Sequence, residues 1–236
     1  EEAPVGETRV LEYLGLDDTI LDIGLTPNRA DCNAMWNLAK EVGAVLHRKV
    51  TWPSCQAASK IGTDGSFKIA SKTEKCPVFV GKVVNHVKVG PSPKWLANYL
   101  HAYGIKSINN VVDISNFFMV ETGQPLHYYD LSKLPHHEIT VVDDVEMTMQ
   151  ALDGQDYEIK KGDLLITTGG QPTGIAGIMG GEESKIDEST TSIFIEAAVF
   201  NAVSIRNTAR RLGLSTEAAM HFTKGIEPMA PIKAVD

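Results

Sequence analysis

The sequence predicts an α+β fold in which a mixed, largely antiparallel sheet carries flanking helices and is preceded by a small partial α/β domain. Short runs rich in β-branched residues follow one another from Glu138 onward, separated by turn residues such as Asp153-Gly154. Helical patterns lie on both sides of this region. With 236 residues, 43% of them hydrophobic, the chain can bury a core in one large or two modest domains.

The first 56 residues are predicted to form the partial domain as a strand, a turn and a helix. Thr19–Leu25 alternates apolar and polar residues as a half-buried strand does, and residues 26–29 form a turn cluster. Asp31 is expected to cap a helix whose apolar residues recur at helical spacing to about His47. The small and polar residues 54–65 are typical of a linker, so we expect the domain boundary there.

Residues 57–236 are predicted to form the second module, which contains the sheet. Pro91-Ser92-Pro93 opens a helix, and Gly213 ends another that starts near Asn201. The apolar residues of Val111–Val120 fit a buried helix better than a strand. Strands are expected over residues 78–89, 139–142, 146–151, 157–159, 164–167 and 193–197.

The charge balance excludes one broad class of function. The 22 Lys and Arg residues against 30 Asp and Glu residues leave a net charge of −8, which excludes a general nucleic-acid coat protein. No apolar run approaches the roughly 18–20 residues of a membrane span, and no signal peptide is evident, so we expect a cytoplasmic protein. Cys32, Cys55 and Cys76 are widely spaced, which argues against structural disulfides and a zinc site.

The segment 169–181 is dense in glycine, yet it does not have the pattern of a phosphate-binding loop. No Lys-Ser or Lys-Thr follows it, and Glu182-Glu183 would repel phosphate. Glycine lets a backbone pass close to another strand or to a ligand, and the sequence leaves both alternatives open.

Two side chains are candidates for chemistry. His127 is expected in a loop, where functional side chains are common; a structural role and a metal site with Asp130 are the alternatives. Glu196 lies among apolar residues of a predicted strand, where an unpaired carboxylate is costly, so it is either paired or kept for a ligand. Four basic residues near the end of the chain form either a solvated helix face or a phosphate or RNA site: Arg206, Arg210, Arg211 and Lys224.

Five segments carry the most specific signal in the sequence. They are TPNRADC at 26–32, SINNVVDISNF at 107–117, GQPLHYYDL at 123–131, GIAGIMGGEES at 174–184 and SIRNTARRLGLSTEA at 204–218. In their order and spacing they resemble the β subunit of bacterial phenylalanyl-tRNA synthetase. The resemblance covers nearly the whole chain and implies a piece of a longer subunit that contains the editing module.

This resemblance implies proofreading hydrolysis of tyrosine misattached to phenylalanine tRNA, by a positioned water at the aminoacyl ester. Glu196 falls on the family position that reads the tyrosine hydroxyl, and His127 falls on the editing-site histidine. Thr216 completes the residues expected at the catalytic site. Substrate contacts are expected from Ser115, Asn116, Ala176, Gly177, Ala218 and Lys106, the last near the terminal adenosine.

The resemblance also implies partners and cofactors. The substrate would be the 3′ end of aminoacylated phenylalanine tRNA, and the α subunit would join the β subunit in an α2β2 heterotetramer. No cofactor or metal is expected in this piece, whereas the complete synthetase is expected to use ATP and magnesium. The alternative is a non-catalytic tRNA-docking or scaffold domain, which a cavity filled by side chains would favour.

The sequence departs from the usual family pattern at several positions. Tyr128-Tyr129 stands where Ala-Phe is commoner, Ser115 where Thr is frequent, and Lys106 where relatives commonly carry Arg. The segment 221–224 has less charge than its family counterpart, which weakens the case for RNA contact there.

Overall fold

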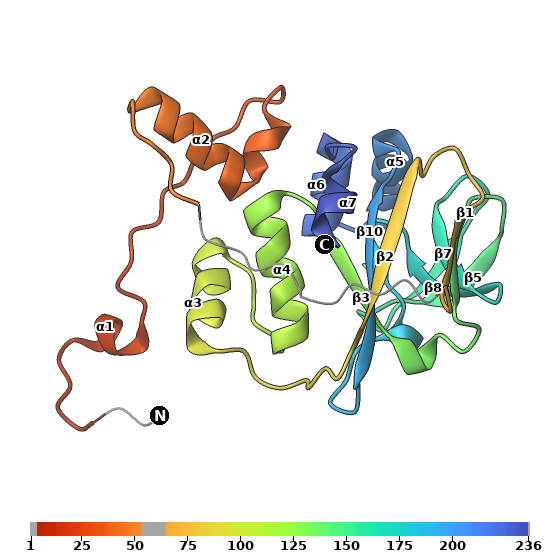
Figure 1. The fold of residues 1–236 in the computed structure, drawn as a ribbon, viewed down its shortest axis with the longest axis horizontal. Coiled ribbons are helices and arrows are strands. Elements are labelled where there is room, and N and C mark those ends of the chain that lie inside the picture. The colour runs from red at the N-terminus through yellow and green to blue at the C-terminus, as the bar shows by residue number, and fades with distance from the viewer. Residues whose placement is uncertain (1–3, 53–64, 236) are drawn as a thin grey trace.

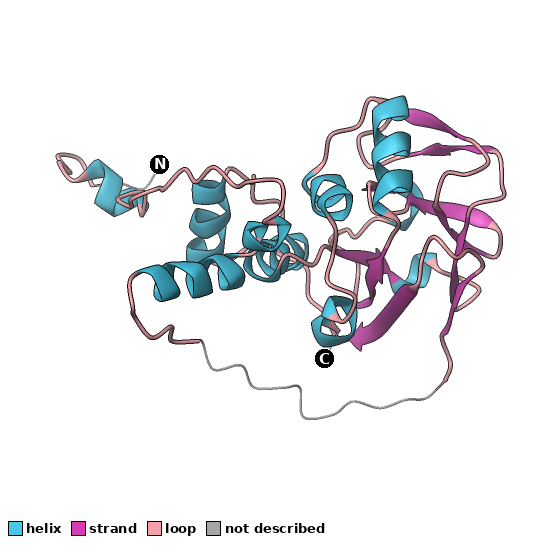
Figure 2. Ribbon diagram, turned by 90° about the horizontal axis from the view of Figure 1, so that it is seen from above, coloured by secondary structure: helices cyan, strands magenta, loops and turns pink. Residues whose placement is uncertain are grey.

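The computed structural model of the protein describes residues 4–52 and 65–235. Figure 1 shows the strands at one side of the molecule, α3 (Lys94–Tyr103) and α4 (Asn110–Thr122) beside them, and the N-terminal segment beyond these helices. Figure 2 shows the same separation from above. In the part of the chain that is described, no helix is long and apolar enough to cross a membrane.

The described strands form three sheets, and the predicted antiparallel character is confirmed. The first sheet has the order β1-β4-β7-β8-β9, in which only β1 and β4 are parallel; the second has the order β2-β10-β3, and β5 pairs with β6 in the third. The bounds are β1 Lys68–Ser71, β2 Val78–Asn85, β3 Leu126–Asp130, β4 Glu138–Val142, β5 Met147–Gln150, β6 Asp156–Ile159, β7 Leu165–Thr168, β8 Gln171–Ile175, β9 Met179–Gly180 and β10 Ser192–Val199.

The three helices expected in the second module are confirmed. The Asn109 side chain accepts hydrogen bonds from two backbone N–H groups in the first turn of α4, and the helix ends at Gly123 with φ 79°. At the start of α5 (Ala202–Leu212) the Asn201 side chain accepts a hydrogen bond from the backbone N–H of Ser204, and the helix ends at Gly213 with φ 71°. The other helices and turns are α1 Val10–Leu14, α2 Met35–Val45, α5 Ala202–Leu212, α6 Glu217–Lys224 and α7 Ala230–Ala234, with 3₁₀ turns at Ala30–Asn33, Leu131–Lys133 and Glu182–Ser184.

The main core joins the three-stranded sheet to the five-stranded sheet. Tyr129 and Phe194 of the first share one buried cluster with Ile139, Leu165 and Ile175 of the second. Burying each large apolar side chain contributes about 1.5–3 kcal/mol relative to leaving it exposed. The core therefore backs β3 and β10 firmly, and these two strands carry the site described below.

Two predictions for the N-terminal segment are wrong. Thr19–Leu25 is irregular, and Leu21 is 75% exposed. An alternating sequence forms a strand only where another strand supplies hydrogen bonds, and none of the described strands pairs with this segment. Asp31 does not cap α2; Ala34 occupies that position, and the Asp31 carboxylate pairs with Arg29 instead. The described N-terminal residues thus contain helices without a strand.

The predicted linker falls mostly on residues 53–64, which lie outside the described residues, as does Cys55. The boundary near residue 56 therefore stays a prediction.

Candidate functional site

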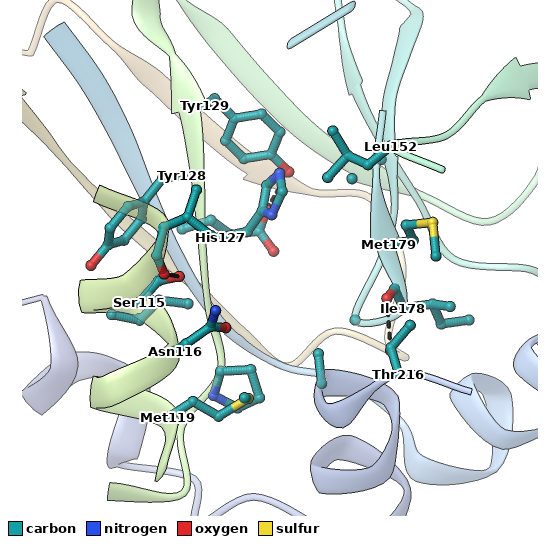
Figure 3. A pocket seen from close by; sticks show the side chains of 18 of the residues that line it. Ser115, Asn116, Met119, His127, Tyr128, Tyr129, Leu152, Ile178, Met179 and Thr216 are labelled. Carbon is teal, nitrogen blue, oxygen red and sulfur yellow. Dashed lines mark hydrogen bonds between the residues drawn. The ribbon is translucent and has the colours of Figure 1, made fainter. Parts of the chain in front are cut away.

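A cavity of about 470 Å³ lies between β3, β10, α4, the β8–β9 hairpin and the start of α6. Figure 3 shows His127 and Asn116 on one side of it and Thr216 on the other. Eight of the nine predicted site residues line this cavity, namely Ser115, Asn116, His127, Ala176, Gly177, Glu196, Thr216 and Ala218. Lys106 does not line it and lies in a separate depression with His101 and Ser107.

Glu196 and His127 face each other across neighbouring strands. In the antiparallel pairing of β10 with β3, Glu196 is the direct partner of His127. Tyr129 lies two residues further along β3 and therefore projects from the same face. The prediction that His127 lies in a loop is wrong, because the Leu126–Asp130 segment hydrogen-bonds to β10 as an edge strand.

The Glu196 carboxyl is buried and accepts one hydrogen bond from the residues that the structure describes. Glu196 is 6% exposed, and Tyr129 Oη donates to its Oε2 at 2.5 Å. Within the described ranges, Oε1 has no hydrogen bond and no cation pairs with the carboxylate. Burial raises the pKa of Glu196 to about 7, although the Tyr129 hydrogen bond acts in the opposite direction. Near neutral pH the group therefore exchanges between acid and carboxylate.

The His127 imidazole packs edge-on against the ring of Tyr129, with the ring centroids 4.4 Å apart. Burial lowers the pKa of His127 to about 4, so the ring is neutral at pH 7. Neither ring nitrogen has a hydrogen bond to another described residue, and neither is sealed from the cavity. Both are available to a ligand.

A metal site on His127 and Asp130 is not formed. The two residues are three apart on one strand and point to opposite faces. The Asp130 carboxylate accepts hydrogen bonds from Ser132 and from Thr190. Among the residues that the structure describes, no three His, Cys, Asp or Glu side chains are grouped so as to hold a metal ion.

Helix α4 supplies Ser115 and Asn116 to the cavity. Ser115 Oγ donates a hydrogen bond to the carbonyl oxygen of Val112 at 2.7 Å. Because its proton is engaged by the backbone, the Ser115 hydroxyl is poorly placed to act as a nucleophile. The Asn116 amide has no hydrogen bond to a described side chain or backbone group, and it borders the open space in Figure 3. Asn116 is thus free to bind a ligand.

Asp113 anchors the start of α4 on the side away from the cavity. Its carboxylate is 0% exposed and accepts hydrogen bonds from Ser92 Oγ and Ser107 Oγ, both at 2.5 Å, and from the backbone N–H of Ile108 at 2.9 Å. These bonds fix the direction in which the helix presents Asn116.

The opposite wall combines the glycine-rich hairpin with the start of α6. Ala176 and Gly177 form its turn, and Gly177 has φ 66°, a region that glycine adopts without strain. Thr216 Oγ1 accepts from the backbone N–H of Ala219 and donates to the carbonyl of Ile178 at 2.9 Å, the dashed line in Figure 3. One hydroxyl therefore ties the helix to the hairpin.

The four basic residues near the end of the chain do not form one site. Arg211 pairs with Asp163, and Lys224 donates to Asn33 Oδ1 at 3.0 Å. Arg206 and Arg210 are exposed on α5. A solvated helix face describes them better than an anion site.

The sequence profile of a family described as "B3/4 domain" matches residues 75–236. This range includes β2, β3, β10 and every residue that lines the cavity. The chain belongs to the B3/4 domain family.

Two relatives of this B3/4 domain sequence carry the same name. The phenylalanine–tRNA ligase beta subunit of Geobacter sulfurreducens is 41% identical over 240 residues, which cover 100% of this chain and 30% of that protein. Its counterpart in Carboxydothermus hydrogenoformans is 41% identical over 227 residues, which cover 96% and 28%. A solved N-terminal fragment of the phenylalanyl-tRNA synthetase β subunit from Pyrococcus horikoshii aligns with 92% of this chain and 68% of its own, at TM-score 0.45 and 10% identity.

The chain spans 30% or less of the length of these curated relatives. Its predicted resemblance to the β subunit of phenylalanyl-tRNA synthetase is confirmed, and the sequence corresponds to part of such a subunit.

Gly180 sets the distance between the β8–β9 hairpin and His127 in this B3/4 domain. A Cβ at Gly180 would lie 2.4 Å from Cε1 of His127, so Gly180→Ala must displace the ring. We expect a loss of about 1–3 kcal/mol in the free energy of unfolding, measured by urea denaturation. Gly174 pairs with Gly180, and its Cβ would meet nothing closer than 3.5 Å, so Gly174→Ala is the matched control. Equal losses in the two variants would contradict the steric explanation.

Sequence reasoning missed three residues that build the site: Tyr129, Asp113 and Gly180. Asp113 had a usable signal, because it is a carboxylate within an apolar helix pattern, as Glu196 is within a strand pattern. Tyr129 was visible only as a departure from the family pattern and Gly180 only as one glycine of the 169–181 segment, because their individual roles depend on contacts with distant segments.

Proposed function

We propose that this B3/4 domain is the proofreading module of a phenylalanyl-tRNA synthetase β subunit and hydrolyses tyrosine misattached to phenylalanine tRNA. The supporting observation is a cavity with a buried carboxyl, Glu196, whose Oε1 has no hydrogen-bond partner among the described residues. The non-catalytic scaffold alternative predicts a cavity filled by side chains, and this cavity is open.

Glu196 accounts for a preference for tyrosine over phenylalanine. The two amino acids differ by one hydroxyl, and an apolar pocket rejects an added hydroxyl by only about 100-fold. A site built to hydrogen-bond that hydroxyl discriminates much better, because the analogue leaves a buried polar group unpaired. Phenylalanine in this cavity would leave Oε1 of Glu196 without a partner.

The proposed reaction uses water as the nucleophile. The water oxygen bonds to the ester carbonyl carbon, the bond from that carbon to the ribose oxygen breaks, and a proton passes to the ribose oxygen. His127 is a weak base at pH 7 because its pKa is about 4, so it accepts a hydrogen bond from the water and orients it. The Asn116 amide is free to donate to the developing oxyanion. Thr216 holds the opposite wall in place.

The proposal includes the partners of the complete enzyme. The 3′ end of aminoacylated phenylalanine tRNA is the substrate, and the α subunit completes an α2β2 assembly that uses ATP and magnesium for aminoacylation in the cytoplasm. Residues 57–236 form the editing module, and residues 1–56 belong to a preceding domain. The net charge of −8 predicts weak and salt-sensitive binding of free tRNA by this chain alone.

Glu196→Ala in the complete synthetase tests the proposal. Release of tyrosine from mischarged phenylalanine tRNA is expected to fall at least about 10-fold, since a hydrogen bond to an ionised group is lost, while phenylalanine charging persists. Glu188→Ala removes an exposed carboxylate outside the cavity and serves as control. Undiminished release by Glu196→Ala contradicts the role of this residue, and no release by the wild type favours the scaffold alternative.

A further inference from the structure

Tyr129 is the one hydrogen-bond donor to the Glu196 side chain in the described parts of the chain, and it has no part in the proposed hydrolysis. Tyr129 is 1% exposed, and its Oη lies 2.5 Å from Oε2 of Glu196. The two residues are 67 positions apart in the sequence. Strand pairing brings them together, because Tyr129 lies one pleat along from the direct partner of Glu196.

Packing fixes the direction of the Tyr129 hydroxyl. The His127 ring lies edge-on to the Tyr129 ring, and the Phe194 ring lies on another side with its centroid 6.3 Å away. Gly174 faces Oη, and a Cβ there would lie 3.6 Å from it, so the hairpin closes against the hydroxyl. The phenol is therefore held in one orientation before any ligand enters.

We propose that Tyr129 is a specificity-determining positioning residue, whose hydroxyl holds the Glu196 carboxyl so that Oε1 is presented to the hydroxyl of the substrate. This inference rests on the proposed function. The carboxylate then accepts hydrogen bonds from two phenols, one from the protein at Oε2 and one from the substrate at Oε1. Without Tyr129, the terminal torsion of Glu196 is free to turn, because that torsion is broad in energy.

The surroundings of Glu196 leave this role to Tyr129. The strand partner of Glu196 on β2 is Gly81, which has no side chain. Its partner on β3 is His127, whose ring is neutral at pH 7. Burial and, to a smaller extent, the negative charge of Glu196 raise the pKa of the Cys76 thiol to about 12, so the thiol stays protonated. Tyr129 is thus the group that favours the charged form of Glu196.

Tyr129→Phe tests the proposal, because it keeps the packed ring and removes only the hydroxyl. Tyr99→Phe is the matched control, since Tyr99 also donates a hydrogen bond to a carboxylate, that of Glu121, which lies outside the cavity. The measurement is kcat/KM of the complete synthetase for deacylation of tyrosyl- and phenylalanyl-tRNA from pH 6 to 9. At pH 7 the ratio of kcat/KM for tyrosyl-tRNA to kcat/KM for phenylalanyl-tRNA should fall about 10-fold in Tyr129→Phe. The midpoint of the pH dependence of this ratio should move to higher pH. Tyr99→Phe should keep the wild-type ratio and midpoint.

Two outcomes overturn the proposal: an unchanged ratio and midpoint, or an equal loss for both substrates at every pH, which indicates a merely structural role. If the wild type releases no tyrosine, the proposed function fails, and a second measurement still decides about Tyr129. The pKa of Glu196 is then followed by carboxyl NMR in this chain. A higher pKa in Tyr129→Phe supports the positioning role, and an equal pKa overturns it.

Discussion

Glu196→Gln is expected to raise the free energy of unfolding at pH 8 by about 3 kcal/mol. Burial raises the pKa of Glu196 from 4.5 to about 7. The folded state then binds the proton more tightly than the unfolded state, so stability falls as the pH rises from 4.5 through 7. The glutamine amide has the shape of the neutral acid and still accepts the hydrogen bond from Tyr129, but it has no charge to desolvate.

Urea denaturation at pH 5 and pH 8 checks this prediction. The two proteins should differ by less than about 1 kcal/mol at pH 5 and by about 3 kcal/mol at pH 8. Burial lowers the pKa values of His127 and His221 to about 4, but these groups are present in both proteins and their contributions cancel in the difference. A gap that does not widen with pH contradicts the prediction. The same variant should lose the proposed preference for tyrosine, which would identify the buried carboxyl as a stability cost retained for function.

Asp113→Ala is expected to lower the free energy of unfolding by about 3–5 kcal/mol. The substitution leaves Ser92 Oγ, Ser107 Oγ and the backbone N–H of Ile108 without their acceptor at a fully buried position. Each unsatisfied buried donor costs about 1–3 kcal/mol. Because α4 begins at this point, its cavity-facing residue Asn116 should also lose its fixed position.

Urea denaturation at pH 7 measures this loss. Asp144→Ala is the control, because Asp144 is exposed and should change stability by no more than about 0.5 kcal/mol. A loss below about 1 kcal/mol in Asp113→Ala would mean that water replaces the carboxylate, and the anchoring role would be wrong.

Local patterns predicted the elements that depend on local energetics. The apolar spacing and the capping residues of α4 and α5 favour a helix regardless of what these helices pack against. β2 and β10 are rich in β-branched or apolar residues along their whole length, which favours a strand. Thr19–Leu25 has the same alternation but no described partner strand, and pairing between strands is not encoded in one of them alone. β3 was not predicted because its short sequence after Pro125 is typical of a loop. It forms a strand only because β10 lies beside it and supplies hydrogen bonds.

The candidate site was predicted in part for similar reasons. Glu196 stands out in the sequence because a carboxylate in an apolar strand needs an explanation, and the family resemblance indicated His127. The bond between Tyr129 and Glu196 could not be predicted, because it depends on the register of two strands that are far apart in the chain. Lys106 precedes a motif that lines the cavity, yet it lies outside the cavity.

Under the proposed function, the pairing of Glu196 with His127 would make accuracy an all-or-none property of the folded sheet. A slip of one residue between β3 and β10 would turn His127 and Tyr129 to the opposite face together. A molecule with a misregistered sheet would therefore lose both the hydrogen-bond partner of Glu196 and the ring proposed to orient water, and it would become inactive rather than indiscriminate. Damage to this sheet would then reduce the number of active molecules while the remaining ones keep their selectivity, which is a safe mode of failure for the proposed proofreading reaction.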